Sequence, residues 1–186
     1  MTGSLFAALW LIFVAYWAVM GVGAKKNIGA RWRTEAGLRV GIVVLIVLAL
    51  RLPVFRQALR NAHAYAASAS MGVIGVALCA LGIGLAIWAR AYLGRNWGMP
   101  MSRKENPELV TSGPYAYVRH PIYTGMLIAM LGSAIGESPF WSLPLALFGL
   151  YFLYSARKEE QLMIEQFPEQ YPAYMARTKM LVPFLL

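Results

Sequence analysis

Two polar segments of the chain contain the side chains that could do chemistry. The first, residues 109–123, reads LVTSGPYAYVRHPIY, and the second, residues 157–177, reads RKEEQLMIEQFPEQYPAYMAR. The first combines a guanidinium, an imidazole and several phenols, whereas the second contains an adjacent pair of carboxylates, Glu159 and Glu160. Imidazole and carboxylate groups are common general acids and bases, so the two segments together are candidates for an active site.

The first segment predicts a helix start. The Ser-Gly-Pro run at residues 112–114 is a turn signal, and the His-Pro pair at residues 120–121 begins a helix because proline fits the first helical position. Arg119, His120 and Tyr123 are therefore expected around a helix N-terminus, where free backbone N–H groups attract a carboxylate. The alternative is that Arg119 and Tyr123 only anchor the chain at a membrane surface.

The paired glutamates of the second segment predict a cationic partner. Glu159 and Glu160 follow an apolar run within about one helical turn, where two carboxylates repel each other and oppose the helix dipole. Arg157, Lys158 or a cationic ligand could compensate them. The alternative is a solvated charge run that continues the helix.

The rest of the second segment predicts a tail that folds back. Pro168 and Pro172 are expected to break the helix, because proline lacks a backbone N–H group. Tyr171, Tyr174 and Arg177 are spaced by three residues, which would place two aromatic rings and a guanidinium on one face.

The composition excludes several classes of protein. Of the residues, 59% are hydrophobic and 13% charged, against about a quarter charged in soluble domains. The single cysteine, Cys79, excludes a disulfide framework and a cysteine-based metal site. The chain has no Asp, which excludes Asp-rich magnesium motifs, and His63 and His120 stand far apart. We therefore expect a membrane protein without a metal.

The net charge of +9 raises the question of nucleic-acid binding. The basic residues lie at the ends of apolar runs, where anionic lipid headgroups attract them, and they form no basic face with interleaved aromatic residues. We expect membrane lipids as partners and no nucleic acid.

The elements that must position these residues are membrane helices. A bilayer core needs roughly 20 apolar residues per helix, and five runs approach this length: residues 5–23, 36–52, 70–89, 121–136 and 140–155. The expected fold is an all-α integral membrane protein of about five transmembrane helices. The first run is expected to be retained rather than cleaved, because residues 1–24 carry no charge and so lack the basic start of a signal peptide.

The chain is expected to divide into two regions. Residues 1–69 hold the first two helices and their connecting loop, in which residues 53–69 resemble an interfacial amphipathic helix. Residues 70–186 hold the last three helices, with a cytoplasmic loop and tail that form the catalytic region.

Small residues in the third run suggest close helix packing, because they let backbones approach in a membrane. The alternative is that glycine is simply common in membrane helices. These residues are Gly72, Gly75, Ala80, Gly82 and Gly84.

The distribution of Lys and Arg predicts the orientation. Fourteen of the seventeen basic residues fall in segments on one side of the five runs. Because basic residues favour the cytoplasmic side, the N-terminus is expected outside and the C-terminus in the cytoplasm. In a bacterial host the membrane would be the inner, plasma membrane.

The two polar segments resemble a known family. LVTSGPYAYVRHPIYTG followed by EEQLMIEQFPEQYPAYMARTKMLVPF is similar to the isoprenylcysteine carboxyl methyltransferases and to the related membrane phospholipid methyltransferases. The similarity covers roughly residues 95–186. Its core is RHPxYxG at residues 119–125, with the glutamate pair and YxxYxxR downstream, and this combination is specific.

The resemblance implies a helical, non-Rossmann enzyme that uses S-adenosyl-L-methionine and has its cofactor site in the cytoplasmic C-terminal region. By the resemblance, Arg157, Glu160 and Arg177 are the expected catalytic residues, and no metal is involved. The expected cofactor-binding residues are Leu109, Val110, Tyr115, His120, Pro121, Ile122, Tyr123, Glu159 and Glu160.

The acceptor implied by the resemblance is a lipid or lipidated molecule that enters from the bilayer. A carboxylate acceptor, as in isoprenylcysteine O-methylation, needs an Arg to hold it. Ser155 stands where carboxyl-methylating members have that Arg, which leaves Arg157 or Arg177 for the role. An ammonium acceptor of the phosphatidylethanolamine type must lose a proton and needs a base. The carboxyl acceptor is the leading expectation, the phospholipid the alternative, and a fold-related NADPH-dependent membrane reductase a lower alternative.

Overall fold

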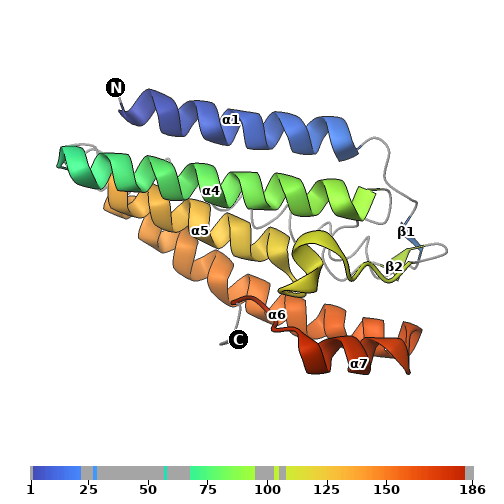
Figure 1. Cartoon of the computed structure of the whole chain (residues 1–186). Helices are drawn as coiled ribbons and strands as arrows, with labels where there is room; N and C mark the ends of the chain where they lie inside the picture. Colours follow the sequence, from blue (N-terminus) through green and yellow to red (C-terminus); the bar gives the residue numbers. More distant parts are fainter. Residues whose placement is uncertain are drawn as a thin grey trace.

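The structure is a computed structural model that describes residues 2–21, 27–28, 57, 68–94, 103–104 and 108–182. Four long helices lie lengthwise beside one another, and a short helix, α7, lies along the end of the last of them (Figure 1). The helices are α1 (Thr2–Gly21), α4 (Ala69–Leu93), α5 (Pro121–Gly136), α6 (Ser142–Gln166) and α7 (Gln170–Arg177).

Short elements connect these helices. The 3-10 turns are η2 (Gly113–Ala116) and η3 (Pro139–Trp141), and two-residue strands β1 (Asn27–Ile28) and β2 (Arg103–Lys104) pair antiparallel. The described portion of the chain is therefore almost entirely helical, as expected.

Three helices in the described residues are long and apolar enough to cross a membrane: Thr2–Gly21, Ala69–Leu93 and Pro139–Gln166. Pro121–Gly136 is a shorter apolar helix. These correspond to four of the five predicted runs. The run at residues 36–52 and most of the connection at residues 53–69 lie outside the described residues, so the total of five spans stays a prediction, as does the division at residue 69.

The interface between α4 and α5 is a contact of backbone against backbone. A Cβ atom at Gly75 of α4 would lie 2.5 Å from the Cα atom of Gly136 of α5, closer than side chains pack. Gly84, on the same helix, has no atom within 4 Å of such a Cβ position. Close approach is thus confirmed for some of the glycine pattern and not for all of it. We call the following residues the glycine seam: Gly75, Gly82, Gly125, Gly132 and Gly136.

Helix α1 attaches to this pair through aromatic side chains. Phe6 and Phe13 are buried against α4 and α5. Trp10 stacks on Trp141 of η3, with ring centroids 5.0 Å apart, and its indole N–H donates to Ser133 Oγ over 3.1 Å. The polar edge of Trp10 is therefore satisfied within the apolar interface.

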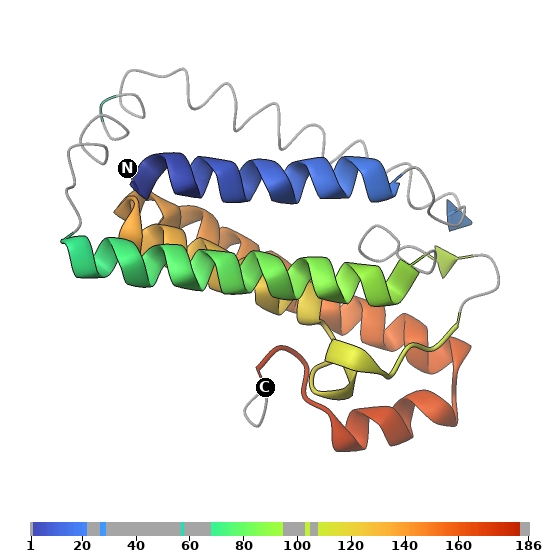
Figure 2. The same ribbon diagram turned by 45° about the horizontal axis from the view of Figure 1, so that its top comes forward.

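The polar elements gather at one end of the helices. Arg90, near the end of α4, is 1% exposed and donates to the carbonyl oxygens of Met20 and Gly94, each over 2.6 Å. The β1–β2 pair, η2 and α7 lie at this end, away from the start of α1 (Figures 1 and 2). We call it the site end. Segments predicted to share one side of the membrane do lie together, whereas which side faces the cytoplasm stays a prediction.

Helix α6 continues beyond the predicted end of its apolar run and carries the charged segment on its last turns. It ends at Gln166, and Pro168 lies in the turn that follows, as predicted. The predicted second break at Pro172 is wrong, because this residue lies inside the first turn of α7, where a missing N–H group is tolerated.

Candidate functional site

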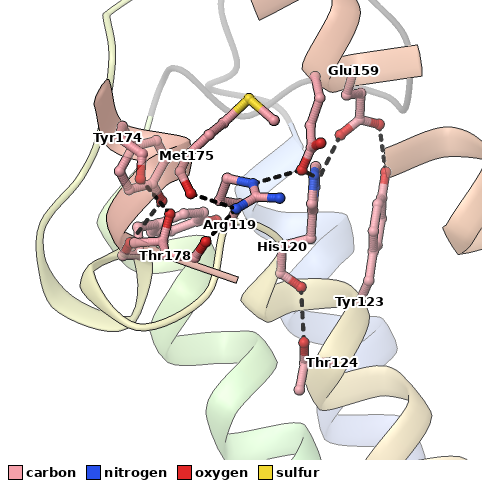
Figure 3. Close-up of polar contacts among 10 residues, drawn as sticks. Arg119, His120, Tyr123, Thr124, Glu159, Tyr174, Met175 and Thr178 are labelled. Atoms are coloured by element: carbon pink, nitrogen blue, oxygen red, sulfur yellow. Dashed lines mark hydrogen bonds and ion pairs between the residues drawn. The ribbon is translucent and has the colours of Figure 1, made fainter. Parts of the chain in front are cut away.

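The site is built on the N-terminus of α5. His120 is the residue that caps this helix and Pro121 occupies its first position, so the predicted helix start is confirmed. Tyr123 follows one turn later and is 8% exposed. The side chains of His120 and Tyr123 consequently reach towards α6 from the same end of α5 (Figure 3).

The paired glutamates of α6 meet these side chains. Tyr123 donates its hydroxyl hydrogen to Glu159 Oε1 over 2.5 Å. His120 Nδ1 lies 3.6 Å from Glu159 Oε2, and His120 Nε2 lies 3.4 Å from Glu160 Oε1. The imidazole ring is therefore placed between the two carboxylates, as Figure 3 shows for Glu159.

Arg119 supplies the full positive charge next to the pair. Its Nε donates to Glu160 Oε1 over 2.6 Å, and both side chains are 8% exposed. Arg157 and Lys158, the partners considered from the sequence, are exposed on α6. The compensating cation is thus a residue that sequence reasoning placed near the helix start but did not include in the site.

The two carboxylates favour a proton on His120. Burial alone lowers the pKa of this imidazole, but hydrogen bonding and charge interactions with Glu159 and Glu160 outweigh burial, so the net pKa lies above the ordinary 6.5. His120 Nε2 is buried and faces Glu160 Oε1 at 3.4 Å, an ion-pair contact without the geometry of a hydrogen bond. A buried ring nitrogen without a hydrogen bond is a site where a ligand atom would be favourable.

A stack of three rings supports the imidazole. The ring of His120 lies parallel to that of Tyr123, with centroids 5.5 Å apart, and Tyr123 stacks on Phe152 of α6 with centroids 4.4 Å apart. Phe152 and Tyr123 belong to an apolar cluster with Ala156 and Leu181. The charged groups are therefore bordered by apolar packing between α5 and α6.

The tail after α7 covers the start of α5. The backbone N–H of Arg119 donates to the carbonyl of Lys179 over 2.8 Å, and that of His120 donates to Met180 over 3.0 Å. The hydroxyl of Thr124 donates to the carbonyl of Leu181. Some of the polar groups expected to attract a ligand carboxylate are therefore bound to the tail, which does fold back as predicted.

Helix α7 packs its two tyrosines inward. Tyr171 and Tyr174 are each 3% exposed, and Tyr174 donates to the carbonyl of Tyr115 over 2.6 Å. Burial raises the pKa of Tyr174 to about 12. Arg177 lies at the surface, with its guanidinium carbon 5.9 Å from the Tyr174 ring centroid. The predicted alignment of the tyrosines is confirmed, whereas the arginine points to the outside.

The structure thus brings a subset of the predicted residues together. His120, Tyr123, Glu159 and Glu160 form one cluster, and Pro121 and Ile122 belong to the helix start that carries it. The other predicted residues lie outside this contact network: Leu109 and Val110 are half-buried before η2, Tyr115 is buried in η2, and Arg157 and Arg177 are exposed.

No metal-binding cluster accompanies this site. Within the ranges that the structure describes, no group of three or more His, Cys, Asp or Glu side chains could hold a metal ion. That the protein works without a metal stays a prediction.

Comparison with known proteins adds three relatives. The chain is 35% identical over 118 residues to the cobalt-zinc-cadmium resistance protein CzcN of Cupriavidus metallidurans, covering 62% of this chain and 49% of that protein. It is 31% identical over 151 residues to the nickel-cobalt-cadmium resistance protein NccN of Alcaligenes xylosoxydans xylosoxydans, covering 79% and 65%. It is 32% identical over 101 residues to the protein-S-isoprenylcysteine O-methyltransferase of Schizosaccharomyces pombe, covering 52% and 43%. The chain therefore spans less than two thirds of each relative.

A family description matches the region of the chain that holds the site. Residues 71–170, more than half of the 186 residues, match the phospholipid methyltransferase family. This range includes all of α5 and α6, with the glutamate pair, and most of α4. The match and the Schizosaccharomyces pombe relative confirm the resemblance seen at RHPxYxG, and the chain belongs to the phospholipid methyltransferase family.

Proposed function

We propose that this protein is an S-adenosyl-L-methionine-dependent methyltransferase of the membrane that methylates a lipophilic acceptor at a cytoplasmic site. The observation that supports it most is the position of His120 between Glu159 and Glu160, inside the range shared with the family. A scaffold protein has no need for two carboxylates and an imidazole at a helix start.

The side chains present fit this cofactor by their chemistry. S-adenosyl-L-methionine contains a sulfonium, an amino group and a carboxylate, and when bound it supplies the methyl group. Glu159, whose side chain is 25% exposed, is suited to one of the cationic groups. His120, when its ring is protonated, is suited to the carboxylate, which would share Nε2 with Glu160 at 3.4 Å.

The contribution of the chain to methyl transfer is positioning and electrostatics. Glu160 and Arg119 neutralise each other at 2.6 Å, so they fix the imidazole without adding net charge. The rings of Tyr123 and Phe152 keep water from one side of the cluster. In-line displacement of a methyl group requires alignment of donor and acceptor more than covalent help from the protein.

A carboxylate acceptor is the first candidate. The 32% identity to an isoprenylcysteine O-methyltransferase favours it. On this chain the carboxylate would need Arg157 or Arg177, because Arg119 already binds Glu160. Both candidates are exposed, so their side chains would have to turn towards the acceptor.

An amine acceptor is the second candidate, and the charges of the described site favour it. Glu159, whose side chain is 25% exposed, can attract a phosphatidylethanolamine-type ammonium group, whereas Glu160 is already paired with Arg119. Glu159 could then take the proton that the nitrogen must lose before it attacks. The family match to phospholipid methyltransferases agrees with this chemistry.

The decisive experiment supplies methyl-labelled S-adenosyl-L-methionine to the purified protein with a total lipid and membrane-protein extract. Labelled product supports methyl transfer, and its absence with every extract contradicts it. Alkaline hydrolysis then distinguishes the acceptors, because a methyl ester releases volatile labelled methanol whereas an N-methyl group stays on the non-volatile amine headgroup.

Matched variants connect the activity to the site. His120→Ala and Glu160→Ala should abolish methyl transfer, whereas Lys158→Gln, at an exposed position on the same helix, should keep it. Full activity in both alanine variants would show that the assigned site is wrong.

Ligand binding distinguishes the methyltransferase from the NADPH-dependent reductase. The family match favours methyl transfer, so we expect S-adenosylhomocysteine to raise the midpoint of thermal unfolding. Stabilisation by NADPH and not by S-adenosylhomocysteine would reverse this assignment.

A further inference from the structure

The guanidinium of Arg119 joins three segments of the fold. It lies immediately before α5, donates from Nε to Glu160 of α6, and donates from Nη1 to the carbonyl oxygens of Met175 and Thr178 at the end of α7. Figure 3 shows the Arg119 side chain beside Met175, Thr178 and His120. One side chain therefore bridges segments that are far apart in the sequence.

The chemistry of this bridge suits arginine. The last carbonyl groups of a helix lack partners within the helix, and a cationic side chain satisfies them and the negative end of the helix dipole. A guanidinium presents several donors in one plane, so it can bind a carboxylate and these carbonyls at the same time. With 8% of the side chain exposed, the charge needs Glu160 as its counter-ion.

The main chain of Arg119 reinforces the same connection. Its N–H donates to the carbonyl of Lys179, and the preceding residue, Val118, forms a parallel bridge with Lys179. The backbone and the side chain of Arg119 therefore both bind the tail. The side-chain and backbone contacts of Arg119 are all made to other residues of the chain.

From these contacts we propose that Arg119 is a positioning residue for the reaction, which acts through Glu160 and through residues 175–180. This proposal rests on the proposed methyl transfer. Arg119 orients the Glu160 carboxylate beside His120 and docks the tail over the start of α5. It contacts neither the cofactor nor the acceptor.

Removal of the guanidinium should have two linked effects. Glu160 would lose its full counter-charge and turn towards His120, and the end of α7 would lose the donor for its carbonyl groups. A residue that bound the acceptor directly would produce neither effect on the tail.

The kinetic test is a double-mutant cycle with Arg119→Gln, Glu160→Gln and the double variant, assayed for kcat and KM. Each single variant should lower kcat/KM by about tenfold to a hundredfold, as expected for loss of a hydrogen bond to a charged group. Because Arg119 acts partly through Glu160 and partly through the tail, the double variant should lose more than Glu160→Gln but clearly less than the product of the two single losses. Multiplication of the two single losses would overturn the proposal.

The conservative variant Arg119→Lys gives a further comparison. A Lys ammonium can neutralise Glu160 but cannot reproduce the planar fork to the carbonyls. Its kcat/KM should therefore lie between those of the wild type and Arg119→Gln. A value at or below that of Arg119→Gln would contradict action through the Glu160 charge.

Hydrogen exchange tests the tail without any assay of methyl transfer. Arg119→Gln should speed exchange of the amides in residues 174–181 and of Arg119 and His120 by about tenfold or more, leaving α4 unchanged. Lys158→Gln is the control and should match the wild type. If Arg119→Gln fails to fold, the same measurement is made on Arg119→Lys. Exchange of the tail amides as slow as in the wild type would then overturn the proposal. If the wild type transfers no methyl group, the proposed function fails while this result still stands.

Discussion

Helix α5 has two different neighbours, and the contrast between them explains how the site is held. Against α4 it packs mainly backbone to backbone along the glycine seam, with small groups such as the Ala86 Cβ atom beside the contact. Against α6 and the tail it makes contacts through charged and aromatic side chains, with Tyr123 bound to Glu159 and stacked on Phe152. Close packing therefore holds one face of α5, and hydrogen bonds and ring stacking hold the other.

This contrast explains how a small membrane protein can place charged groups at a helix start. Burying charged groups is costly unless each has a partner in good geometry. The seam supplies rigid positioning without polar groups, so the partners on the other face can be arranged for ligand binding. The two interfaces should therefore respond differently to mutation and to pH.

The largest effect is expected in the seam. Gly75→Ala puts a Cβ atom 2.5 Å from the Gly136 Cα atom, so the helices must separate. Such overpacking costs about 1–3 kcal/mol, which corresponds to a fall of about 2–12 °C in the midpoint of thermal unfolding.

Gly84→Ala is the control for this change, because nothing lies within 4 Å of its added atom. It should unfold at or slightly above the wild-type temperature, since alanine favours helix over glycine. Equal destabilisation by both substitutions would contradict the seam.

A pH-dependent effect is expected next, and only on the site face. Because the pKa of His120 is raised above 6.5 in the folded protein, its ion pairs stabilise the fold fully below pH 6.5. That stabilisation is lost as the pH rises through the raised pKa. The difference in unfolding midpoint between wild type and His120→Gln should therefore be largest in mild acid and smallest in alkali.

Gly75→Ala serves as the comparison for this measurement, because no titrating group is involved in its cost. Its destabilisation should be the same at each pH. If the difference in unfolding midpoint between the wild type and His120→Gln did not depend on pH, the ion pairs of His120 would not be a source of stability.

A smaller effect is expected from Tyr123→Phe. The variant keeps the ring stack on Phe152 and loses the hydrogen bond to Glu159. Affinity for S-adenosylhomocysteine, measured by calorimetry, should fall by about tenfold. Tyr117→Phe, at a side chain 66% exposed, should leave the affinity unchanged. An unaffected affinity in Tyr123→Phe would separate Glu159 from cofactor binding.

The smallest effect is expected from Trp10→Phe in α1, far from the charged cluster. It removes the indole hydrogen bond to Ser133 and weakens the stack on Trp141. We expect a loss of about 1 kcal/mol in stability and unchanged methyl transfer, measured by thermal unfolding and by rate. A large loss of activity would show that α1 contributes to the site.

Much of the helical fold follows from the sequence. Apolar length predicts the helices, and the bounds of α5 are as predicted because proline and glycine mark both ends. The apolar run at residues 140–155 indicates only the span, and α6 continues to Gln166, just before the break predicted at Pro168. Charged residues such as Glu159 and Glu160 continue a helix readily.

The site was predictable in its members and less so in its connections. His120, Tyr123 and the glutamate pair were found because their types match the chemistry. Arg119 was recognised as a member of the polar group and yet not included in the site, although its place directly before His120 was a usable signal. Its bonds to α7 were not predictable, because the prolines predict that the tail turns back but not which residues it then contacts.

The glycine seam also determines where the molecule can move. The proposed acceptor would approach the glutamate pair from the bilayer along one of the two interfaces of α5. Opening the α4–α5 interface would separate backbone atoms along most of the length of α5, whereas opening the α5–α6 interface requires rotation of side chains such as Tyr123 and Phe152. Side-chain rotation is fast and local. Helix α5 is thus expected to stay still with α4, while α6 and the tail open and close.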